Sequence, residues 1–339
     1  MDIRISLIVV TYNRLGELNS LIDSLGNVLK RQDVEMILID DQSTDGTLEA
    51  MTKVLAYMGD RARVIQQPKD GPGMGRNRGI AAARGQILAF VDTDCIAHPE
   101  WLEELTAPFD DPRVGAVGGP DRCHPDDPSL THYIDYLMTS FLTTGGVRGS
   151  KKAKGGAYHP RSFNMAVRRE AAESVGGFPV IWYGEDILFS WRIQQQGWKL
   201  EFAEGAWVYH RRRTSVRGWA TQLFRMGRAR WWMGRYDRKL LDPIYMLPLM
   251  EWLIGIFAVG GLFIDGGPQT ASIGVLSLAG IYTLAMGLDA ARSTRRAAAL
   301  VIVPFLFFMR EAAYAAGSIQ GLRKPLPDME GALERVART

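Results

Sequence analysis

The strongest constraint on the fold is an alternation of apolar runs and helical patterns along the first part of the chain. Apolar residues, many of them β-branched, run over 5–10, 34–39 and 87–91, and apolar side chains recur at helical spacing over 15–25. Strands that alternate with helices predict a parallel, doubly wound α/β sheet with right-handed crossovers. The glycine-rich stretch 71–77 lacks the pattern of a phosphate loop or a dinucleotide fingerprint, so we expect a tight turn into a helix there.

Two carboxylates, Asp92 and Asp94, follow the run over 87–91 and are one residue apart. In an open α/β sheet, ligands bind outside the carboxyl ends of the strands. Residues i and i+2 share a face, and two oxygen donors suit a divalent cation such as Mg²⁺ or Mn²⁺. A turn that uses Asp for its local hydrogen bonding explains the same residues. The triplet alone therefore leaves both interpretations open.

A second acidic pair, Glu185 and Asp186, falls at a predicted helix start. Unpaired backbone amides stabilise a carboxylate there, and this capping role accounts for one of the two. The alternative uses the neighbouring rings of Trp182 and Tyr183, which would lie against the apolar face of a sugar while an acid takes a hydroxyl proton. The spacing does not decide between these two roles.

The positive charge of the chain is concentrated in residues 211–240. This segment carries ten Arg and Lys residues against one Asp, in a chain whose total net charge is +3. Such a block implies an anionic partner, either phosphate or an acidic membrane surface, and we expect no nucleic-acid partner. Two cysteines, Cys95 and Cys123, give no disulfide framework and fit a reducing compartment.

The basic segment also has an amphipathic pattern. On a helical wheel the apolar residues Trp219, Leu223, Met226, Trp231 and Met233 fall on one side, and Arg217, Arg225, Arg228 and Arg235 fall on the other. We expect a helix that lies in the membrane interface, with its rings in the acyl boundary and its arginines at lipid phosphates. A solvated helix surface is the alternative.

Three apolar runs fill the C-terminal third. Residues 243–264 and 272–288 approach the ~20 residues that a bilayer crossing needs, and we expect both to span a membrane. The third run, 297–309, is interrupted by Arg310 and Glu311, which favours a re-entrant or interfacial segment with these two residues paired or facing the catalytic domain. Buried core helices are the alternative.

Arginines between the second and third apolar runs favour a cytosolic loop at 292–296. The N-terminal domain would then lie in the cytosol as well. The start of the chain supports this, because a short strand-like run follows Arg4 where a signal peptide would place a longer apolar segment.

Six ordered blocks, at 9–13, 40–47, 75–79, 92–94, 164–169 and 184–186, carry a resemblance to a known family. Together they resemble family 2 of the inverting glycosyltransferases, which have the GT-A fold. The blocks cover about the first two thirds of the chain, and six in order are far more specific than any one of them.

The resemblance implies roles for the matching residues. Those that would bind the nucleotide sugar are Thr11, Tyr12, Asp40, Asp41, Arg76, Asp92 and Thr93. Asp94 would hold a divalent cation, Mn²⁺ or Mg²⁺, with Asp92 and His210. Asp186, beside Glu185, would be the general base. The residues at the acceptor would be Trp182, Tyr183 and Asn164.

The implied activity is the inverting transfer of a sugar from a nucleotide diphosphate, UDP favoured over GDP, to a hydroxyl of a membrane-associated acceptor. That acceptor would be a polyprenyl-linked glycan or a surface-polysaccharide precursor at the cytoplasmic membrane. The chain would divide into a cytosolic GT-A domain (1–210), an interfacial segment (211–240), a transmembrane region (241–320) and a polar tail (321–339).

Two alternatives to this activity remain. A processive polysaccharide synthase is less favoured, because Met226 follows Arg225 where many polymerising members have Gln-x-x-Arg-Trp. A membrane scaffold that binds nucleotide sugars without catalysis is the other alternative, and the intact Asp92, Asp94 and Asp186 argue against it.

Overall fold

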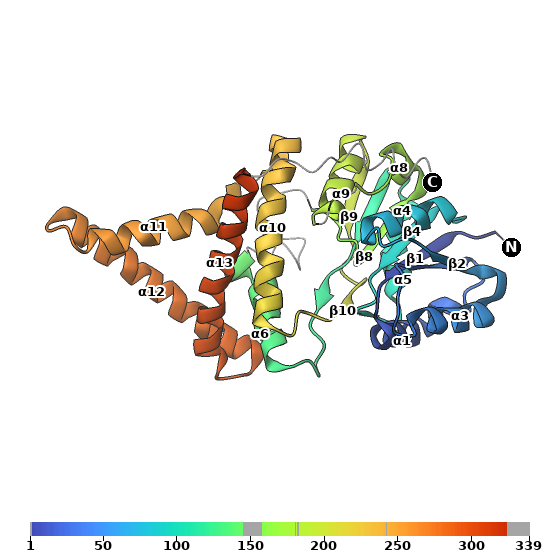
Figure 1. Cartoon of the computed structure of the whole chain (residues 1–339), viewed down its shortest axis with the longest axis horizontal. Helices are drawn as coiled ribbons and strands as arrows, with labels where there is room; N and C mark the ends of the chain where they lie inside the picture. Colours follow the sequence, from blue (N-terminus) through green and yellow to red (C-terminus); the bar gives the residue numbers. More distant parts are fainter. Residues whose placement is uncertain (1, 145–157, 180, 182, 242, 324–339) are drawn as a thin grey trace.

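The computed structural model describes residues 2–144, 158–179, 181, 183–241 and 243–323. A layered α/β domain makes up the first part, and long helices extend away from it (Figure 1). The main sheet has the order β3-β2-β1-β4-β8-β6-β9. Its strands are β1 (Ile5–Thr11), β2 (Val34–Asp40), β3 (Ala62–Gln66), β4 (Ile87–Val91), β6 (Val114–Gly118), β8 (Asn164–Arg168) and β9 (Lys199–Phe202). β8 is antiparallel to its neighbours and the other pairings are parallel, as predicted.

Helices cover both faces of this sheet (Figure 1). One face packs against α1 (Leu15–Ser24), α2 (Gly26–Lys30), α3 (Thr47–Met58) and α5 (Trp101–Thr106), and the other against α4 (Pro72–Ala82), α8 (Arg169–Ser174) and α9 (Glu185–Gln195). Alternate residues of β1 serve the two sides: Leu7 and Val9 enter one core and Ile8 the other. Burial on both faces explains why the strand sequences are continuously apolar.

A smaller sheet lies beside the main one. Its three strands, in the order β5-β10-β7, are β5 (Cys95–Ala97), β10 (Val208–His210) and β7 (Asp121–Arg122). β10 runs antiparallel to β5, with His210 opposite Cys95, and parallel to β7. This pairing brings the end of the α/β domain back to the residues that follow β4.

The glycine-rich stretch differs from the expected turn. The turn is confined to Gly71, whose φ of 84° favours glycine, and α4 begins at the next residue, Pro72. The later glycines lie inside the helix. A Cβ at Gly75 would meet Val10 at 2.6 Å, and one at Gly79 would meet Ile8 at 2.4 Å. These glycines therefore let α4 pack closely on β1.

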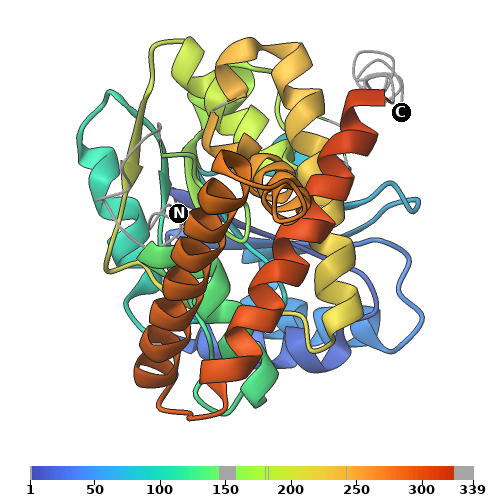
Figure 2. The same cartoon turned by 90° about the vertical axis from the view of Figure 1, so that its left-hand side faces the viewer.

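The remaining helices form a second body. They are α6 (Ser129–Thr139), α7 (Phe141–Thr144), α10 (Val216–Tyr236), α11 (Leu247–Gly261), α12 (Gly267–Thr294) and α13 (Ala299–Arg323). Short 3₁₀ turns cover Gly59–Arg61, Ala107–Asp110, Arg238–Leu240 and Pro243–Met246. α11 and α12 form a hairpin that projects from the molecule, and α13 returns beside α10 (Figures 1 and 2). Side chains of α6, α10, α12 and α13 share one core.

Two of these helices, α12 and α13, are long and apolar enough to cross a membrane. The first apolar run, 243–264, differs from the expectation. It divides into a 3₁₀ turn and the 15-residue α11, which at 1.5 Å per residue is shorter than a hydrocarbon core of about 30 Å. The third run is longer than expected, because α13 continues through Arg310 and Glu311.

The expected pairing within α13 is present. Nε of Arg310 donates to Oε1 of Glu311 at 2.7 Å, and its Nη1 donates to the carbonyl of Leu137 on α6 at 2.6 Å. The charged pair thus faces α6 within the helical body, which removes the interruption that the sequence suggested.

The apolar face of α10 also differs from the prediction. Trp219 and Leu223 are buried in the core shared with α6, α12 and α13, and Met233 is buried against α9. Glycines on α13 allow the close packing: a Cβ at Gly317 would meet the carbonyl oxygen of Phe224 at 1.9 Å. Protein therefore occupies the positions that the sequence assigned to lipid, because the helical wheel does not distinguish the two apolar surroundings.

Candidate active site

Predicted site residues lie at the carboxyl ends of neighbouring strands. Thr11 ends β1, Asp40 ends β2, and Asp92 directly follows β4. β1 lies between β2 and β4, so the chain changes direction across the sheet at this point. Ligands bind at such a switch point in open α/β sheets. The topology therefore gathers groups that are far apart in the sequence.

Arg76, on α4, links this edge to another segment of the chain. Its guanidinium lies 2.9 Å from Oδ1 of Asp92 and 3.2 Å from Oε1 of Glu185. Burial lowers the pKa of Arg76, but the charges of Asp92 and Glu185 raise it by more. One buried guanidinium thus brings the first acidic pair next to the second.

The second acidic pair lies in the first turn of α9, which follows the N-cap Gly184. Burial and the adjacent charge of Asp186 raise the pKa of Glu185 to about 7, against the effect of Arg76. Asp186 accepts a hydrogen bond from the N–H of Ile187 at 2.8 Å and lies 3.8 Å from Nη1 of Arg161. Because their surroundings differ, the two acids can take different roles.

Asp94 contacts two basic groups. Its Oδ1 is 3.4 Å from Nε2 of His210, and its Oδ2 is 3.2 Å from Nη1 of Arg14. Burial raises the pKa of Asp94, but His210 and Arg14 lower it by more, so the acid is charged at neutral pH. Burial lowers the pKa of His210, but Asp94 and Asp121 raise it to about 9. Phe163 stacks on the imidazole with ring centroids 4.5 Å apart.

Asp121 and Arg212 support His210 from behind. Oδ2 of Asp121 is 3.5 Å from Nδ1 of His210 and 2.6 Å from Nη1 of Arg212. Arg212 also contacts Asp135 on α6 at 2.8 Å. No sequence pattern marks these residues or Arg14, because Arg212 belongs to a basic run and Asp121 follows a strand without a motif. The pairing of β7 with β10 brings Asp121 to His210, whereas Arg14, just before α1, contacts Asp94 directly.

Asp94, Cys95 and His210 form a candidate cation site. Their ligand atoms all lie within 4.8 Å of one another. Carboxylate and imidazole ligands suit Mn²⁺, and the imidazole must be neutral to bind it. Asp94 and His210 therefore fit a divalent cation, whereas burial raises the pKa of the Cys95 thiol and keeps it protonated. Asp92 was also predicted at the cation, but in this structure it pairs with Arg76.

The two acids predicted to bind the nucleotide are buried at the end of β2. Asp40 accepts a hydrogen bond from the N–H of Ser43 at 3.1 Å. Asp41 accepts from Nε2 of Gln67 at 2.6 Å and from the N–H of Asp70 at 3.1 Å. Both acids therefore also hold the loops that surround the strand end.

Three further predicted contacts to the nucleotide sugar lie at the same edge. The Oγ1 of Thr11 is buried without a hydrogen-bond partner among the described residues. Tyr12 is 38% exposed, and its hydroxyl oxygen accepts a hydrogen bond from Nζ of Lys69 at 2.5 Å. Thr93, between the two acids, is buried. Thr11 thus has a hydroxyl without a hydrogen-bond partner among the described residues, and Tyr12 has exposed surface that a ligand could contact.

The predicted acceptor residues have different outcomes. Trp182 lies outside the described residues. Tyr183 is partly exposed, and its hydroxyl is 3.5 Å from Nη1 of Arg225. The prediction for Asn164 is wrong: it is fully buried, its Oδ1 accepts from Nε1 of Trp101 at 2.8 Å, and its Nδ2 donates to the carbonyls of Pro120 and Ala206. Its amide joins the two sheets and has no capacity left for an acceptor.

The sheet order and the acidic edge define an α/β protein of the GT-A type. The mannosyltransferase PcManGT from Pyrobaculum calidifontis, solved in complex with GDP-Man and Mn²⁺, has this fold, with a TM-score of 0.61 and 18% sequence identity over 95% of this chain and 88% of that one. The chain belongs to glycosyl transferase family 2, whose model matches residues 6–176.

Curated relatives extend the match beyond the family model. Glycosyltransferase AglE of Haloferax volcanii is 26% identical over 74% of this chain and 80% of its own length. The putative glycosyltransferase EpsH of Bacillus subtilis is 27% identical over 66% of each chain. The poly-beta-1,6-N-acetyl-D-glucosamine synthase of Staphylococcus aureus is 26% identical over 75% of this chain and 62% of its own length. The chain thus spans less than two thirds of the synthase.

Proposed function

We propose that this glycosyltransferase transfers a sugar, with inversion, from a nucleotide-diphosphate sugar to a hydroxyl of a membrane-associated acceptor. The observation that carries the proposal is the bridge through Arg76, which lies 2.9 Å from Asp92 and 3.2 Å from Glu185. It brings the acids that would face the diphosphate next to the acids that would face the acceptor. An in-line displacement needs this arrangement, because the nucleophile and the leaving group lie on opposite sides of the anomeric carbon.

In the proposed reaction Asp186 accepts the proton of the acceptor hydroxyl as that oxygen attacks the sugar. Glu185 holds Arg76, and Arg76 in turn orients Asp92 and offers positive charge toward the phosphates. Thr11 and Tyr12, at the end of β1, would contact the nucleotide. No covalent intermediate on the protein is required, because inversion takes one displacement.

Asp94 and His210 would hold a divalent cation, Mn²⁺ or Mg²⁺. When bound, the cation would stabilise the negative charge of the departing diphosphate. Arg14 and Asp121, which contact these two ligands, would fix their positions. PcManGT, solved with GDP-Man and Mn²⁺, supports a nucleotide-diphosphate sugar as the donor and a divalent cation at these residues.

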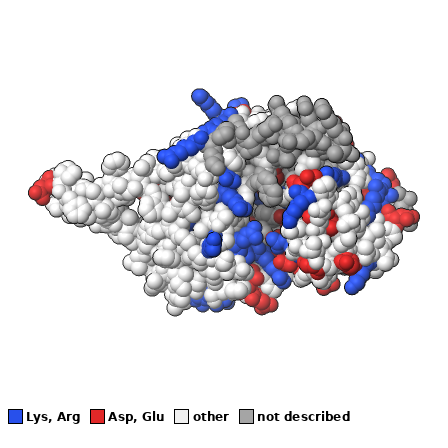
Figure 3. Space-filling view, in the orientation of Figure 1, with Lys and Arg blue, Asp and Glu red and all other residues white. Residues whose placement is uncertain are grey.

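The C-terminal helices supply the membrane part of the proposal. α11, α12, the turn between them and the first half of α13 expose large apolar side chains, including Phe257, Phe263 and Val301, which are 76%, 84% and 73% exposed. Over this part of the molecule charged side chains are sparse, whereas Lys and Arg gather where it meets the α/β domain (Figure 3). An exposed apolar surface of this extent is unusual for a soluble protein, and acyl chains of a membrane would cover it. We place the α/β domain on the cytosolic side of the cytoplasmic membrane.

A donor-binding and transfer experiment tests the function. The thermal midpoint of the detergent-solubilised protein is measured with UDP-sugars and GDP-sugars, each with Mn²⁺ and with chelator. We expect one donor class to raise the midpoint only when Mn²⁺ is present. The same donor, radiolabelled, is then incubated with lipid extracts. One added sugar supports the proposal, a ladder of products supports a processive synthase, and binding without transfer supports a non-catalytic scaffold.

A further inference from the structure

Arg230, on α10, is a buried arginine that has no acidic partner among the described residues. Three arginines are buried in the described part of the chain: Arg76, Arg212 and Arg230. Arg76 and Arg212 each lie between two carboxylates. Within the same described residues, no carboxylate lies within ion-pair distance of Arg230, which is 8% exposed. A buried charge of this kind is costly unless an anion neutralises it.

The groups around Arg230 are aromatic or neutral hydrogen-bond formers. Its guanidinium carbon lies 3.6 Å from the ring centroid of Tyr245, so this ring covers one face of the guanidinium. The buried hydroxyl of Tyr314, on α13, lies next to the same guanidinium and has no other hydrogen-bond partner among the described residues. These neighbours provide donors that match the oxygens of a phosphate and supply no charge that competes with it.

His159 connects this place to the catalytic acids. Its Nδ1 is buried and lacks a hydrogen-bond partner in the described structure. Burial and the charges of Arg161 and Arg230 lower the pKa of His159 to about 4, whereas Asp186 raises it, so the imidazole lies within electrostatic reach of both Arg230 and Asp186 and is neutral at pH 7. α10 also packs directly against the start of α9, since a Cβ at Gly184 would meet the side chain of Met233 at 2.9 Å.

The other side of Arg230 leads to the apolar helices. Tyr245 lies in the turn that precedes α11, and the first residues of α11 include Leu247 and Met250, which are 46% and 50% exposed. An anion at Arg230 would therefore have an apolar surface on one side and the catalytic acids on the other.

We propose that Arg230 binds the phosphate of a prenyl-phosphate-linked acceptor, with Tyr314 and His159 as further hydrogen-bonding groups and the prenyl chain along the start of α11. The inference rests on the proposed function and narrows its acceptor to a lipid that carries a phosphate. The phosphate anchors the acceptor at the junction, and the group attached to it reaches the acids at the start of α9.

Thermal shift on the full chain in detergent micelles tests this site. The probe is citronellyl phosphate. Citronellol and inorganic phosphate are tested separately as controls for its prenyl chain and for its phosphate. Arg230→Met removes the charge and keeps the apolar bulk, and Arg230→Lys keeps a charge without the fork of donors. Arg217→Met is the matched control, because Arg217 is an exposed arginine on the same helix.

We expect citronellyl phosphate to raise the thermal midpoint of the native protein, and neither citronellol nor inorganic phosphate to do so at the same concentration. Arg230→Met is expected to bind the probe about tenfold or more weakly, and Arg230→Lys to retain part of the affinity. Arg217→Met should bind it normally. Without ligand, Arg230→Met should melt at the same temperature as the native protein or higher, since it removes an unpaired buried charge.

Three results would overturn the inference. An equal shift in Arg230→Met would place the phosphate elsewhere, and an equal shift with inorganic phosphate alone would make the site one for free anions. A lower midpoint of ligand-free Arg230→Met would assign the arginine to the stability of the fold. The donor-induced shift with Mn²⁺, measured on the same samples, separates the two proposals: if it is present while citronellyl phosphate has no effect, this inference alone fails.

Discussion

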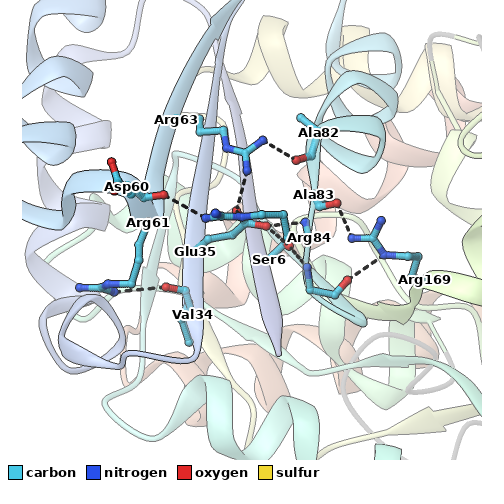
Figure 4. A network of polar contacts seen from close by, with 11 residues as sticks. Ser6, Val34, Glu35, Asp60, Arg61, Arg63, Ala82, Ala83, Arg84 and Arg169 are labelled. Atoms are coloured by element: carbon cyan, nitrogen blue, oxygen red, sulfur yellow. Dashed lines mark hydrogen bonds and ion pairs between the residues drawn. The ribbon is translucent and has the colours of Figure 1, made fainter. Parts of the chain in front are cut away.

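The acids at the two ends of the strands in the main sheet differ in how completely basic groups neutralise them. At the edge where the strands begin, Glu35 of β2 accepts hydrogen bonds from Oγ of Ser6 and Nε of Arg84, each at 2.7 Å, and from the N–H of Arg84 at 2.5 Å (Figure 4). Arg63 lies 3.6 Å away. Burial raises the pKa of Glu35, but these donors lower it by more.

At the opposite edge, two acids share one arginine. Arg76 lies between Asp92 and Glu185, and the pKa of Glu185 is nevertheless raised to about 7. The opposite directions of the two glutamate pKa values have a physical meaning. The network at Glu35 contains its own counter-charges and stabilises the fold, whereas at Glu185 burial and the charge of Asp186 outweigh the guanidinium that this acid shares with Asp92.

Replacing the proposed base should produce the largest effect on activity. We expect Asp186→Asn to lower turnover by about 10²- to 10⁴-fold, since the hydroxyl proton loses its acceptor. The thermal midpoint should stay close to that of the native protein, because among the described residues the side chain of Asp186 makes a long contact to Arg161 and accepts one hydrogen bond, from the N–H of Ile187, which the amide oxygen of Asn can also accept. Transfer of radiolabelled sugar and thermal melting measure the two effects. Glu173→Gln, on the exposed surface of α8, is the control, and an Asp186→Asn enzyme as active as this control would discard the assignment of the base.

The acid at the other edge should show the reverse pattern. Glu35→Gln leaves Arg84 and Arg63 without their buried partner, so we expect the free energy of unfolding to fall by about 3 kcal/mol. Turnover per folded molecule should not change. Unfolding by denaturant in micelles, followed by tryptophan fluorescence, and the transfer assay measure the two quantities. Lost turnover in a variant of native stability would show that the two edges are coupled, and would contradict the comparison.

The sequence predicts more of the catalytic edge than of its supports. The strand ends, Asp92, Asp94 and the pair at 185–186 are legible because each follows a clear apolar run or opens a helix. Arg14 and Asp121 are not legible, since their roles depend on contacts to Asp94 and His210 that the tertiary fold creates. Asn164 misleads for the same reason: an amide in a motif reads as a ligand contact, but the joining of two sheets buries it.

The C-terminal helices show a second limit of sequence patterns. Apolar periodicity on α10 predicts correctly that one face avoids water, but it does not say whether lipid or protein covers that face. In the structure Trp219 packs against other helices, while Phe263, at the end of the α11–α12 hairpin, stays 84% exposed. The unpaired Arg230 has no sequence signature either, because it lies in a run of exposed arginines.

Cation binding at the catalytic edge should depend on pH through His210. The pKa of His210 is raised to about 9, so the metal-free ion pair with Asp94 stabilises the fold at low pH and loses that contribution as the pH rises through about 9. A cation must displace this proton, so its affinity should rise by roughly three- to tenfold per pH unit between pH 6.5 and 9 and then level off. Titration of Mn²⁺, followed by its paramagnetic resonance signal, measures the affinity. A pH-independent affinity, or His210→Gln binding Mn²⁺ as the native protein does, would remove His210 from the cation site.

The smallest expected effect is on the stability of the cation-free protein. The pKa of Glu185 is about 7 in the folded chain and near 4.5 in the unfolded one. At pH values between these two, the folded state therefore binds more protons than the unfolded state. The free energy of unfolding should therefore decline as the pH rises from 4.5 to 7, by on the order of 1 kcal/mol for each pH unit. Glu185→Gln should lose this decline. Glu35→Gln should keep it, since its pKa is shifted the other way and its contribution is lost only as the pH falls below the ordinary range of a glutamate. Thermal melting of both variants with chelator across this pH range measures the difference, and equal slopes in the two would show that the charge at the catalytic edge is already balanced by the protein.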